Sequence, residues 1–142
     1  MKYKQLFITG LLFALSAIAA SAQNDAGPIR SSPAYAEILL RKTELLADLD
    51  AYSEQYTEQN PRIIDARFEL AALDKALEKV YGVKPSETGK LTLALGKLIV
   101  KRAELETTLN RLTRSYNKDH PDVKRAKRRV DIFENSINEI LK

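Results

Sequence analysis

The sequence predicts an all-α protein made of two repeated helix–(Asn/His)-Pro–helix units, each an antiparallel helical hairpin, that together form a coiled-coil-like four-helix assembly. Three observations predict this fold class. Charged residues make up 30% of the 142 residues, with only 5 Gly and 5 Pro, a composition that favours helices over β-sandwiches and barrels. Apolar residues recur at alternating steps of three and four. The two halves of the chain also match each other at an offset of 60 residues.

The first 22 residues have the three parts of a secretory signal peptide. Lys2 and Lys4 supply positive charge, residues 6–20 are mostly apolar, and Ala20-Ser21-Ala22 has the small–x–small pattern that a signal peptidase cleaves. The apolar stretch is shorter than the roughly 20 residues that a membrane-spanning helix needs. We therefore expect a cleaved signal at 1–22 and a bacterial periplasmic or secreted chain with no stable membrane span. A flexible N-terminal segment is expected at 23–32.

Four helices are expected, at about 33–58, 61–81, 87–118 and 121–141, from the apolar spacing and the helix start and stop signals. They form helical repeat 1 over 33–81 and helical repeat 2 over 88–142, joined by a linker at 82–87. Ser86 is the expected N-cap of the third helix. The seams between paired helices are predicted to contain Leu49, Leu70, Leu109 and Val130.

Two seam positions are charged, Lys42 in the first repeat and Arg102 in the second. Long basic side chains commonly bury the aliphatic stem along apolar surface while the charge stays in water. We expect this arrangement at both positions.

One motif, Tyr-x-x-x-(Asn/His)-Pro-x-(Ile/Val), occurs once in each repeat, and we call it the repeat turn motif. Proline lacks an N–H and suits the first position of a helix, and it keeps the preceding residue out of the helical region. A tight reversal at each proline is therefore favoured, giving two hairpins. The heptad spacing of apolar residues continues across each proline without interruption, however, so a continuous helix with a kink at the proline is the alternative. The motif residues are Tyr56, Asn60, Pro61, Ile63, Tyr116, His120, Pro121 and Val123.

The two halves differ in charge. Residues 23–82 contain 7 Lys and Arg against 11 Asp and Glu, a net −4, whereas residues 83–142 contain 14 against 8, a net +6. Opposite net charges attract, so we expect the basic residues of the last helix to lie near the acidic first half. The candidate basic partner face comprises Lys124, Arg125, Arg128 and Arg129. Because the chain is expected to be exported, a nucleic-acid partner is not expected.

Catalysis has little support in the composition. The chain has no Cys and a single His, which excludes a disulfide, a thiolate nucleophile and any metal motif that needs two histidines of one chain. His120 precedes a proline and is interpreted as a turn and capping residue. We expect no enzyme activity, no catalytic residues, no cofactor and no metal site.

The repeat turn motif and the residues before it carry a resemblance to a known family. Ser32-Pro33 through Leu49, followed by the motif, resembles the periplasmic coiled-coil region of the bacterial polysaccharide chain-length determinant (co-polymerase) family. The second copy, with His120 and Val123, matches that family's Tyr-x-x-x-His-Pro-x-Val element more closely than the first. The family's members are held in the inner membrane by flanking helices and form rings that regulate export of surface polysaccharide. The resemblance implies a helical module of that pathway.

These observations predict a secreted or periplasmic, non-enzymatic helical interaction or structural module, an accessory in envelope polysaccharide assembly or export. Its expected partner is another protein of unknown identity, and a homo-oligomer is possible. The alternative is a periplasmic holdase-type chaperone that binds unfolded envelope proteins. A membrane-surface binder is less favoured, because the chain has no Trp and the last helix lacks a strong apolar face.

Overall fold

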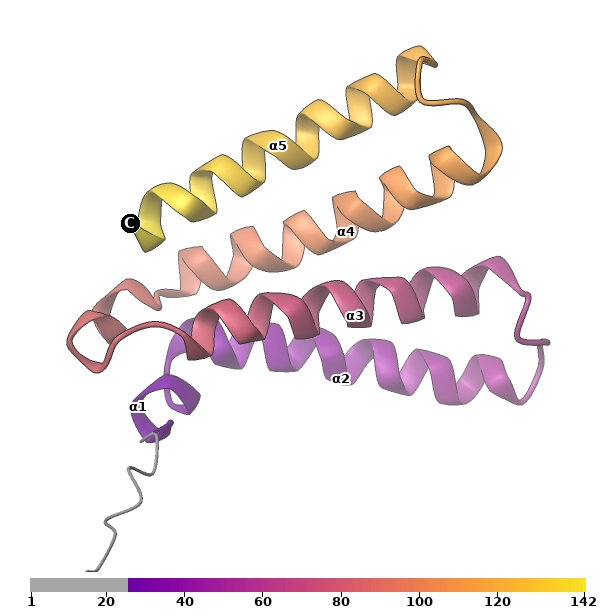
Figure 1. Ribbon diagram of the computed structural model, residues 1–142. Coiled ribbons are helices and arrows are strands. Elements are labelled where there is room, and N and C mark those ends of the chain that lie inside the picture. Colours follow the sequence, from indigo (N-terminus) through magenta and orange to yellow (C-terminus); the bar gives the residue numbers. More distant parts are fainter. Residues whose placement is uncertain (1–25) are drawn as a thin grey trace, which may run out of the picture.

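A computed structural model describes residues 26–142, and within them every regular element is helical, so the predicted all-α class is confirmed (Figure 1). The expected signal peptide at 1–22 lies outside the described residues. No helix in the described part is long and apolar enough to cross a membrane. The elements are α1 (Gly27–Arg30), α2 (Pro33–Ser53), α3 (Pro61–Tyr81), the 3-10 helix η1 (Pro85–Lys90), α4 (Leu93–Ser115) and α5 (Pro121–Leu141).

The chain reverses direction at both Asn60-Pro61 and His120-Pro121, which confirms hairpins and excludes kinked continuous helices. Helices α2 and α3 form hairpin 1, and α4 and α5 form hairpin 2 (Figure 1). Helix α4 is central, because it packs on α2 and α3 as well as on its own partner, whereas α5 packs mainly on α4. Both proline turns lie at the same end of the molecule.

The 60-residue repeat extends to the helix caps. The hydroxyl of Ser32 accepts a hydrogen bond from the Tyr35 N–H at 3.3 Å, and the equivalent hydroxyl of Thr92 accepts from the Leu95 N–H at 3.3 Å. At the starts of α3 and α5, Asn60 Oδ1 and His120 Nδ1 accept N–H bonds at 2.9 and 3.2 Å. Each bond satisfies a donor that a helix N-terminus otherwise leaves free.

The start of α4 differs from the prediction. The third helix was expected from about residue 87 with Ser86 as its N-cap, but η1 occupies residues 85–90 and Thr92 is the cap. Leu91 explains the difference. Its side chain is buried and its carbonyl accepts a hydrogen bond from the Ala34 N–H at 3.2 Å. These two contacts hold the connector against the start of α2, so the regular helix begins only after it.

Three other boundaries also differ. Helix α2 ends at Ser53, earlier than the expected 58, and the residues up to Asn60 form the turn. Helix α4 ends at Ser115, earlier than the expected 118. Part of the segment expected to be flexible, 23–32, is ordered as α1, where Ile29 is buried. The Ser32 hydroxyl donates to the Ile29 carbonyl at 2.6 Å. Burial of one isoleucine therefore ties this segment to the core.

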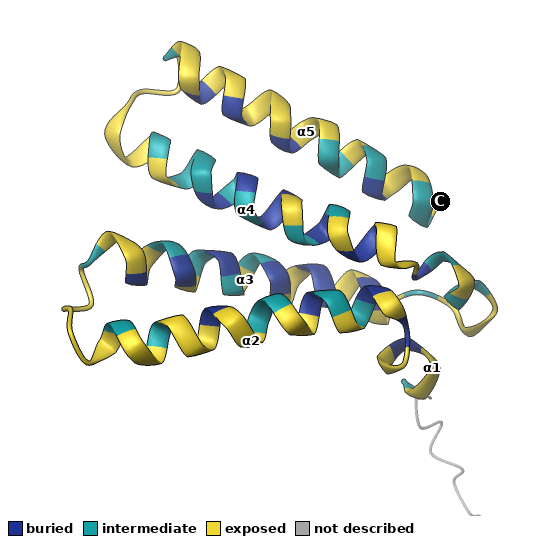
Figure 2. Cartoon of the chain, turned by 180° about the vertical axis from the view of Figure 1, so that it is seen from behind, coloured by how far each residue is buried: buried dark blue, intermediate teal, exposed yellow. Residues whose placement is uncertain are grey.

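The core lies where α2, α3 and α4 meet and extends to Ile137 of α5 (Figure 2). Of the predicted seam residues only Val130 is buried, while Leu49, Leu70 and Leu109 are half-buried. The large side chains with almost no exposed surface are Ile38, Ile63, Leu73, Val80, Leu91 and Leu95.

Gly96 allows α4 to approach α2 closely. A Cβ atom at this position would lie 2.8 Å from Glu37 Cβ and 2.9 Å from Ala34 Cα. Those distances are too short for non-bonded carbon atoms, so a side chain here would push the two helices apart. The glycine therefore sets the distance between the hairpins at this end.

Candidate functional site

A buried polar network joins the two hairpins. The Arg102 guanidinium is buried and donates to Glu134 at 2.9 Å and to Glu106 at 3.1 Å. Glu134 also accepts from Lys79 of α3 at 2.8 Å. These bonds, first that of Lys79 and then the charge of Arg102, lower the pKa of Glu134 against the opposing effect of burial. The expectation that Arg102 keeps its charge in water is therefore wrong, because hairpin 1 covers this position.

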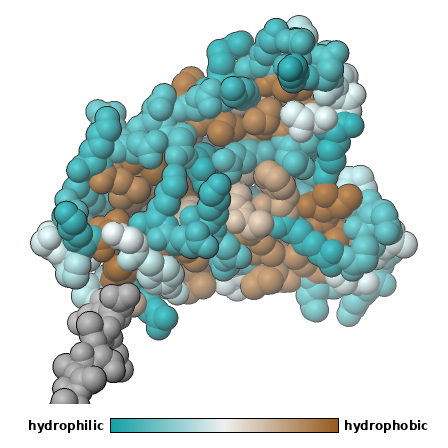
Figure 3. Space-filling view, in the orientation of Figure 1, coloured by the Kyte–Doolittle hydropathy of each residue, from teal (hydrophilic) through white to brown (hydrophobic). Residues whose placement is uncertain are grey.

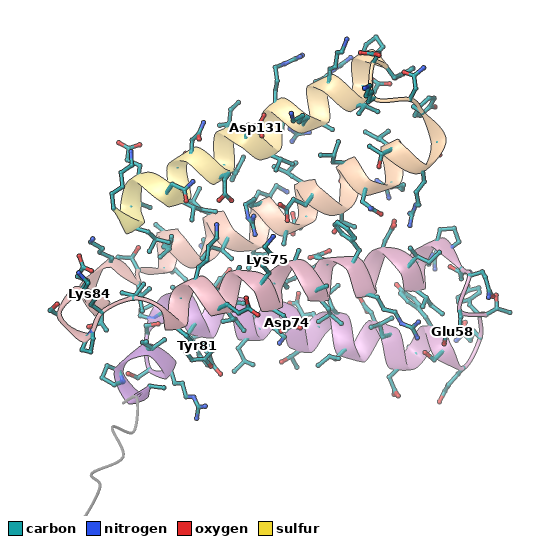
Figure 4. All side chains as sticks on the ribbon, in the orientation of Figure 1. Glu58, Asp74, Lys75, Tyr81, Lys84 and Asp131 are labelled. Atoms are coloured by element: carbon teal, nitrogen blue, oxygen red, sulfur yellow. The ribbon has the colours of Figure 1, made fainter. Side chains whose placement is uncertain are left out.

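The equivalent pair in hairpin 1 is more open. Lys42 contacts Asp74, 32 residues further along, just as Arg102 contacts Glu134. Asp74 is exposed on α3 (Figure 4). At Lys42 the sequence interpretation of a partly buried stem with an accessible charge agrees with the geometry.

A buried carboxylate on α3 was not anticipated from the sequence. Glu69 is buried on α3 and accepts from Arg41 Nε of α2 at 2.7 Å. This hydrogen bond raises the pKa of Arg41, so its guanidinium stays charged. The available signal was the position of Glu69 three residues after Ala66 on the inward face of α3.

The repeat turn motif is brought together within each turn. Ile63 and Val123 are buried beneath the turns, whereas Tyr56 and Tyr116 are exposed. The Tyr116 and His120 rings stack with centroids 4.2 Å apart. His120 therefore has two contacts that explain it, the stack and the cap of α5, and neither requires a ligand.

The first turn has a related aromatic cluster. Tyr52 and Tyr56 meet edge to face, with centroids 6.2 Å apart. The Arg62 guanidinium lies 5.7 Å from the first ring centroid and 6.0 Å from the second. Such cation–π contacts favour an ordered turn.

The basic partner face lies on the exposed side of α5. Lys124 pairs with Asp119 at 3.2 Å and Arg125 with Asp122 at 3.1 Å. Among residues 26–142, no carboxylate lies within ion-pair distance of Arg128 or Arg129. Half of the face is therefore positive charge without a partner in the described chain.

The expected approach of this face to the acidic first half is not observed. Instead, Asp65 of α3 receives Arg111 and Arg114 of α4, the first at 3.5 Å. The reason is the position of α5, which packs mainly on α4 and keeps Lys124, Arg125, Arg128 and Arg129 exposed. The ion pairs of Asp65 with the basic second half are thus formed with α4 and not with α5.

An apolar groove of about 510 Å³ lies between α3 and α4. Figure 3 shows apolar side chains reaching the surface in patches between the helices. Lys75 lies on the α4 side of α3 (Figure 4) and Glu106 faces it from α4, so charged groups flank the apolar floor. The lining consists of Phe68, Ala71, Ala72, Lys75, Glu106, Leu109, Asn110 and Thr113.

The described residues contain no cluster of three His, Cys, Asp or Glu that could hold a metal ion. Comparison of the chain with protein-family models, curated proteins and solved structures found no match in any of the three. The surface features described so far are the basic partner face and the groove, and α2 adds an exposed side that includes Leu39 and Leu46.

Proposed function

We propose that this protein is a non-enzymatic helical interaction module of the bacterial envelope, which binds an acidic partner protein through the basic partner face of α5. The observation that carries the proposal is the set of cations on that face without a carboxylate partner in the described chain. Clustered positive charge raises the encounter rate with an acidic surface and selects its orientation.

The choice of an envelope protein as partner has two supports from the sequence. The signal-like segment at 1–22 favours export, where nucleic acid is not the expected ligand. The resemblance of the repeat turn motif to the polysaccharide chain-length determinant family favours an accessory role in polysaccharide assembly or export.

A binding role also fits the way in which the polar residues are used. Arg102, Glu134 and Glu69 are engaged in pairs that hold helices together, and His120 caps a helix. Catalytic acids and bases are instead gathered around a cavity that holds a substrate.

The test is capture of envelope proteins by the purified chain, with covalent crosslinking and identification of what is bound. The variant is Arg125→Glu/Arg128→Glu/Arg129→Glu. The matched control, Arg30→Glu/Lys84→Glu/Lys97→Glu, makes the same change in net charge at exposed sites outside α5 and the turn before it. We expect acidic proteins that bind the native chain at low salt to be lost with the first variant and kept with the second. Equal binding by both variants would refute the proposal.

The groove between α3 and α4 favours a second candidate, the holdase. Its apolar floor includes Phe68 and Leu109, side chains of the kind that hold segments of unfolded protein. The assay is the aggregation of a chemically denatured protein on dilution, measured by light scattering. A holdase would suppress aggregation, and Phe68→Asp would abolish the suppression while the α5 variant would not.

A further inference from the structure

Hairpin 2 rests on hairpin 1 through one face of α4. In this face Ile99 and Ala103 are buried, and Gly96 touches the start of α2. The residues 60 positions earlier on α2 are Ala36, Leu39 and Thr43, and all three are exposed. The same helix face is thus covered in the second repeat and uncovered in the first, as the view from the α2 side shows (Figure 2). We name the uncovered surface the α2 outer face: Ala36, Leu39, Thr43, Leu46 and Ala47.

The surface that receives α4 is also present twice. On hairpin 1, α4 covers Ile38, Leu73 and Val80, none of which keeps exposed surface. The equivalent residues of hairpin 2 are Leu98, Phe133 and Ile140, which remain only half-buried. We name this second surface the hairpin 2 outer face. Each of the two surfaces that form the inter-hairpin interface is therefore present twice in one chain. One copy of each surface is used within the chain, and the other copy, the α2 outer face or the hairpin 2 outer face, has no partner within the described residues.

Charge complementarity persists when the interface is repeated between two chains. Within the chain, Asp65 of α3 pairs with Arg114 of α4. The residue equivalent to Asp65 in the second repeat is Arg125, and the residue equivalent to Arg114 in the first repeat is Glu54. The same contact between two chains therefore places Arg125 of one chain opposite Glu54 of the next. The signs are exchanged but remain opposite, which a chance match of sequences would not require.

A second charged contact behaves in the same way. Arg41 and Glu104 line one small space between α2 and α4. Their equivalents are Lys101 on the hairpin 2 outer face and Glu44 beside the α2 outer face. The acidic and basic halves, at −4 and +6, therefore attract each other between chains as well as within one.

Two of the three most exposed large apolar side chains meet in the repeated interface. Ile132 is 62% exposed on α5 and Leu46 is 56% exposed on α2. Their equivalents, Ala72 and Glu106, line the same groove between α3 and α4. In the repeated contact, an isoleucine and a leucine thus replace a small residue and a charged one. Large exposed apolar residues that converge on one contact are typical of an interface.

Two positions are less favourable between chains. Ala36 stands where Gly96 allows close approach, so the second chain must sit slightly further out at that end. The Lys79–Glu134 pair has Glu139 and Asp74 as equivalents, which places two carboxylates together. Both features weaken the contact between chains but do not prevent it.

We infer that the acidic partner of the basic partner face is a second copy of this chain, which docks its α2 outer face on the hairpin 2 outer face of the first in head-to-tail order. This inference rests on the proposed function, because Arg125 belongs to the basic partner face. A head-to-tail contact is heterologous, so association continues until a ring closes or a filament forms.

The test expresses the full-length sequence in a bacterial host and measures the mass of the purified protein by sedimentation, over a range on the order of 1–100 µM. Leu39→Glu/Leu46→Glu blocks one surface, and Arg125→Glu/Ile132→Glu blocks the other. All four residues are exposed in the single chain, so helicity by circular dichroism should be retained. We expect concentration-dependent assembly of the native chain, at least tenfold weaker assembly of each variant, and a 1:1 dimer when the two variants are mixed. The matched control is Ile64→Glu, which should assemble like the native chain.

Failure of the mixed variants to form the dimer, or a native chain that stays monomeric at every concentration and salt, would overturn the inference. The proposed function is judged separately, because a monomeric chain that captures a different acidic protein through α5 upholds it.

Charge exchange provides an independent readout. Glu54→Arg and Arg125→Glu should each weaken assembly about two- to fivefold, and the doubly substituted chain should recover it. Glu139→Lys should strengthen assembly, since it removes the like-charged pair. A double variant that is no better than the singles would contradict the contact between residues 54 and 125.

Discussion

Hairpins 1 and 2 carry equivalent residues 60 positions apart, yet they bury different ones. The seam pair of hairpin 1, Lys42 and Asp74, lies at an accessible edge, whereas the pair of hairpin 2, Arg102 and Glu134, is enclosed and joined by Lys79. In the enclosed pair both carboxylates accept from one guanidinium nitrogen, Nη1 of Arg102, while Nε of Arg102 is buried without a hydrogen-bond partner among the described residues. The comparison shows that the neighbouring hairpin decides how much water reaches a given position.

The apolar positions also differ in burial between the hairpins, but here the residues of hairpin 1 are the more buried ones. Ile38 and Leu73 in hairpin 1 are fully buried, while their equivalents Leu98 and Phe133 are half-buried. Hairpin 1 is covered by α4 on this side and hairpin 2 is not. An internal repeat therefore does not make two halves energetically equal when only one interface joins them.

The largest expected difference between the hairpins is in the apolar core. Ile38→Ala should lower the free energy of unfolding by about 2–5 kcal/mol, because the cavity it leaves is enclosed. Leu98→Ala should cost less, about 1–2 kcal/mol, since part of that side chain is already exposed. Denaturant unfolding followed by circular dichroism measures both values. Equal losses would mean that the two faces are covered equally in solution.

The charged seam positions should differ next. Arg102→Met removes the shared donor of Glu106 and Glu134 and should cost about 1–3 kcal/mol, below the full value for a buried pair because Lys79 still contacts Glu134. Lys42→Met should change stability by less than about 1 kcal/mol, as expected for an accessible pair. The same unfolding measurement compares them. A larger loss for Lys42→Met would reverse our interpretation of the two seams.

The pH dependence of the protein's stability tests the role of one carboxylate of hairpin 2, that of Glu134. The pKa of Glu134 is lowered in the folded chain, mainly by its hydrogen bond with Lys79 and the charge of Arg102. A depressed folded-state pKa stabilises the protein above the unfolded-state value and loses that effect as the pH falls through the folded-state value. The native chain should therefore be more stable than Glu134→Gln at pH 7, and the gap should narrow as the pH falls from about 5 to 3. Thermal unfolding across this range tests it, and a constant gap would contradict the assignment.

The smallest difference is expected at the caps. Asn60→Ala should cost about 1 kcal/mol, because an N-cap acceptor is lost. His120→Ala should cost a similar or smaller amount, since its 3.2 Å bond is longer than the 2.9 Å bond of Asn60. Thermal unfolding of the two variants side by side measures the difference. A much larger loss for His120→Ala would point to a role for His120 beyond the cap and the Tyr116 stack.

Local features were predictable because local rules produce them. The prolines at 61 and 121 begin α3 and α5, and α3 spans Pro61–Tyr81 as the spacing predicted. The N-cap role of Asn60 and the capping role of His120 also agree with the structure. In contrast, the start of α4 was placed too early, because the contacts of Leu91 with α2 lie outside the range of any local pattern.

The sequence by itself determined the helical class, the helix breaks at the two prolines, the 60-residue repeat and the opposite charges of the halves, and it favoured hairpins over kinked helices at those breaks. Periodicity, proline and capping act over a few neighbouring residues, so they can be read along the chain. Only the tertiary structure decided that Arg102 is buried while Lys42 is accessible, that Arg114 rather than the α5 cations reaches Asp65, and that the α2 outer face is uncovered. The physical reason is that burial depends on which surface of a hairpin its neighbour covers. Helices α2 and α4 have equivalent faces, but only the face of α4 is covered by the other hairpin.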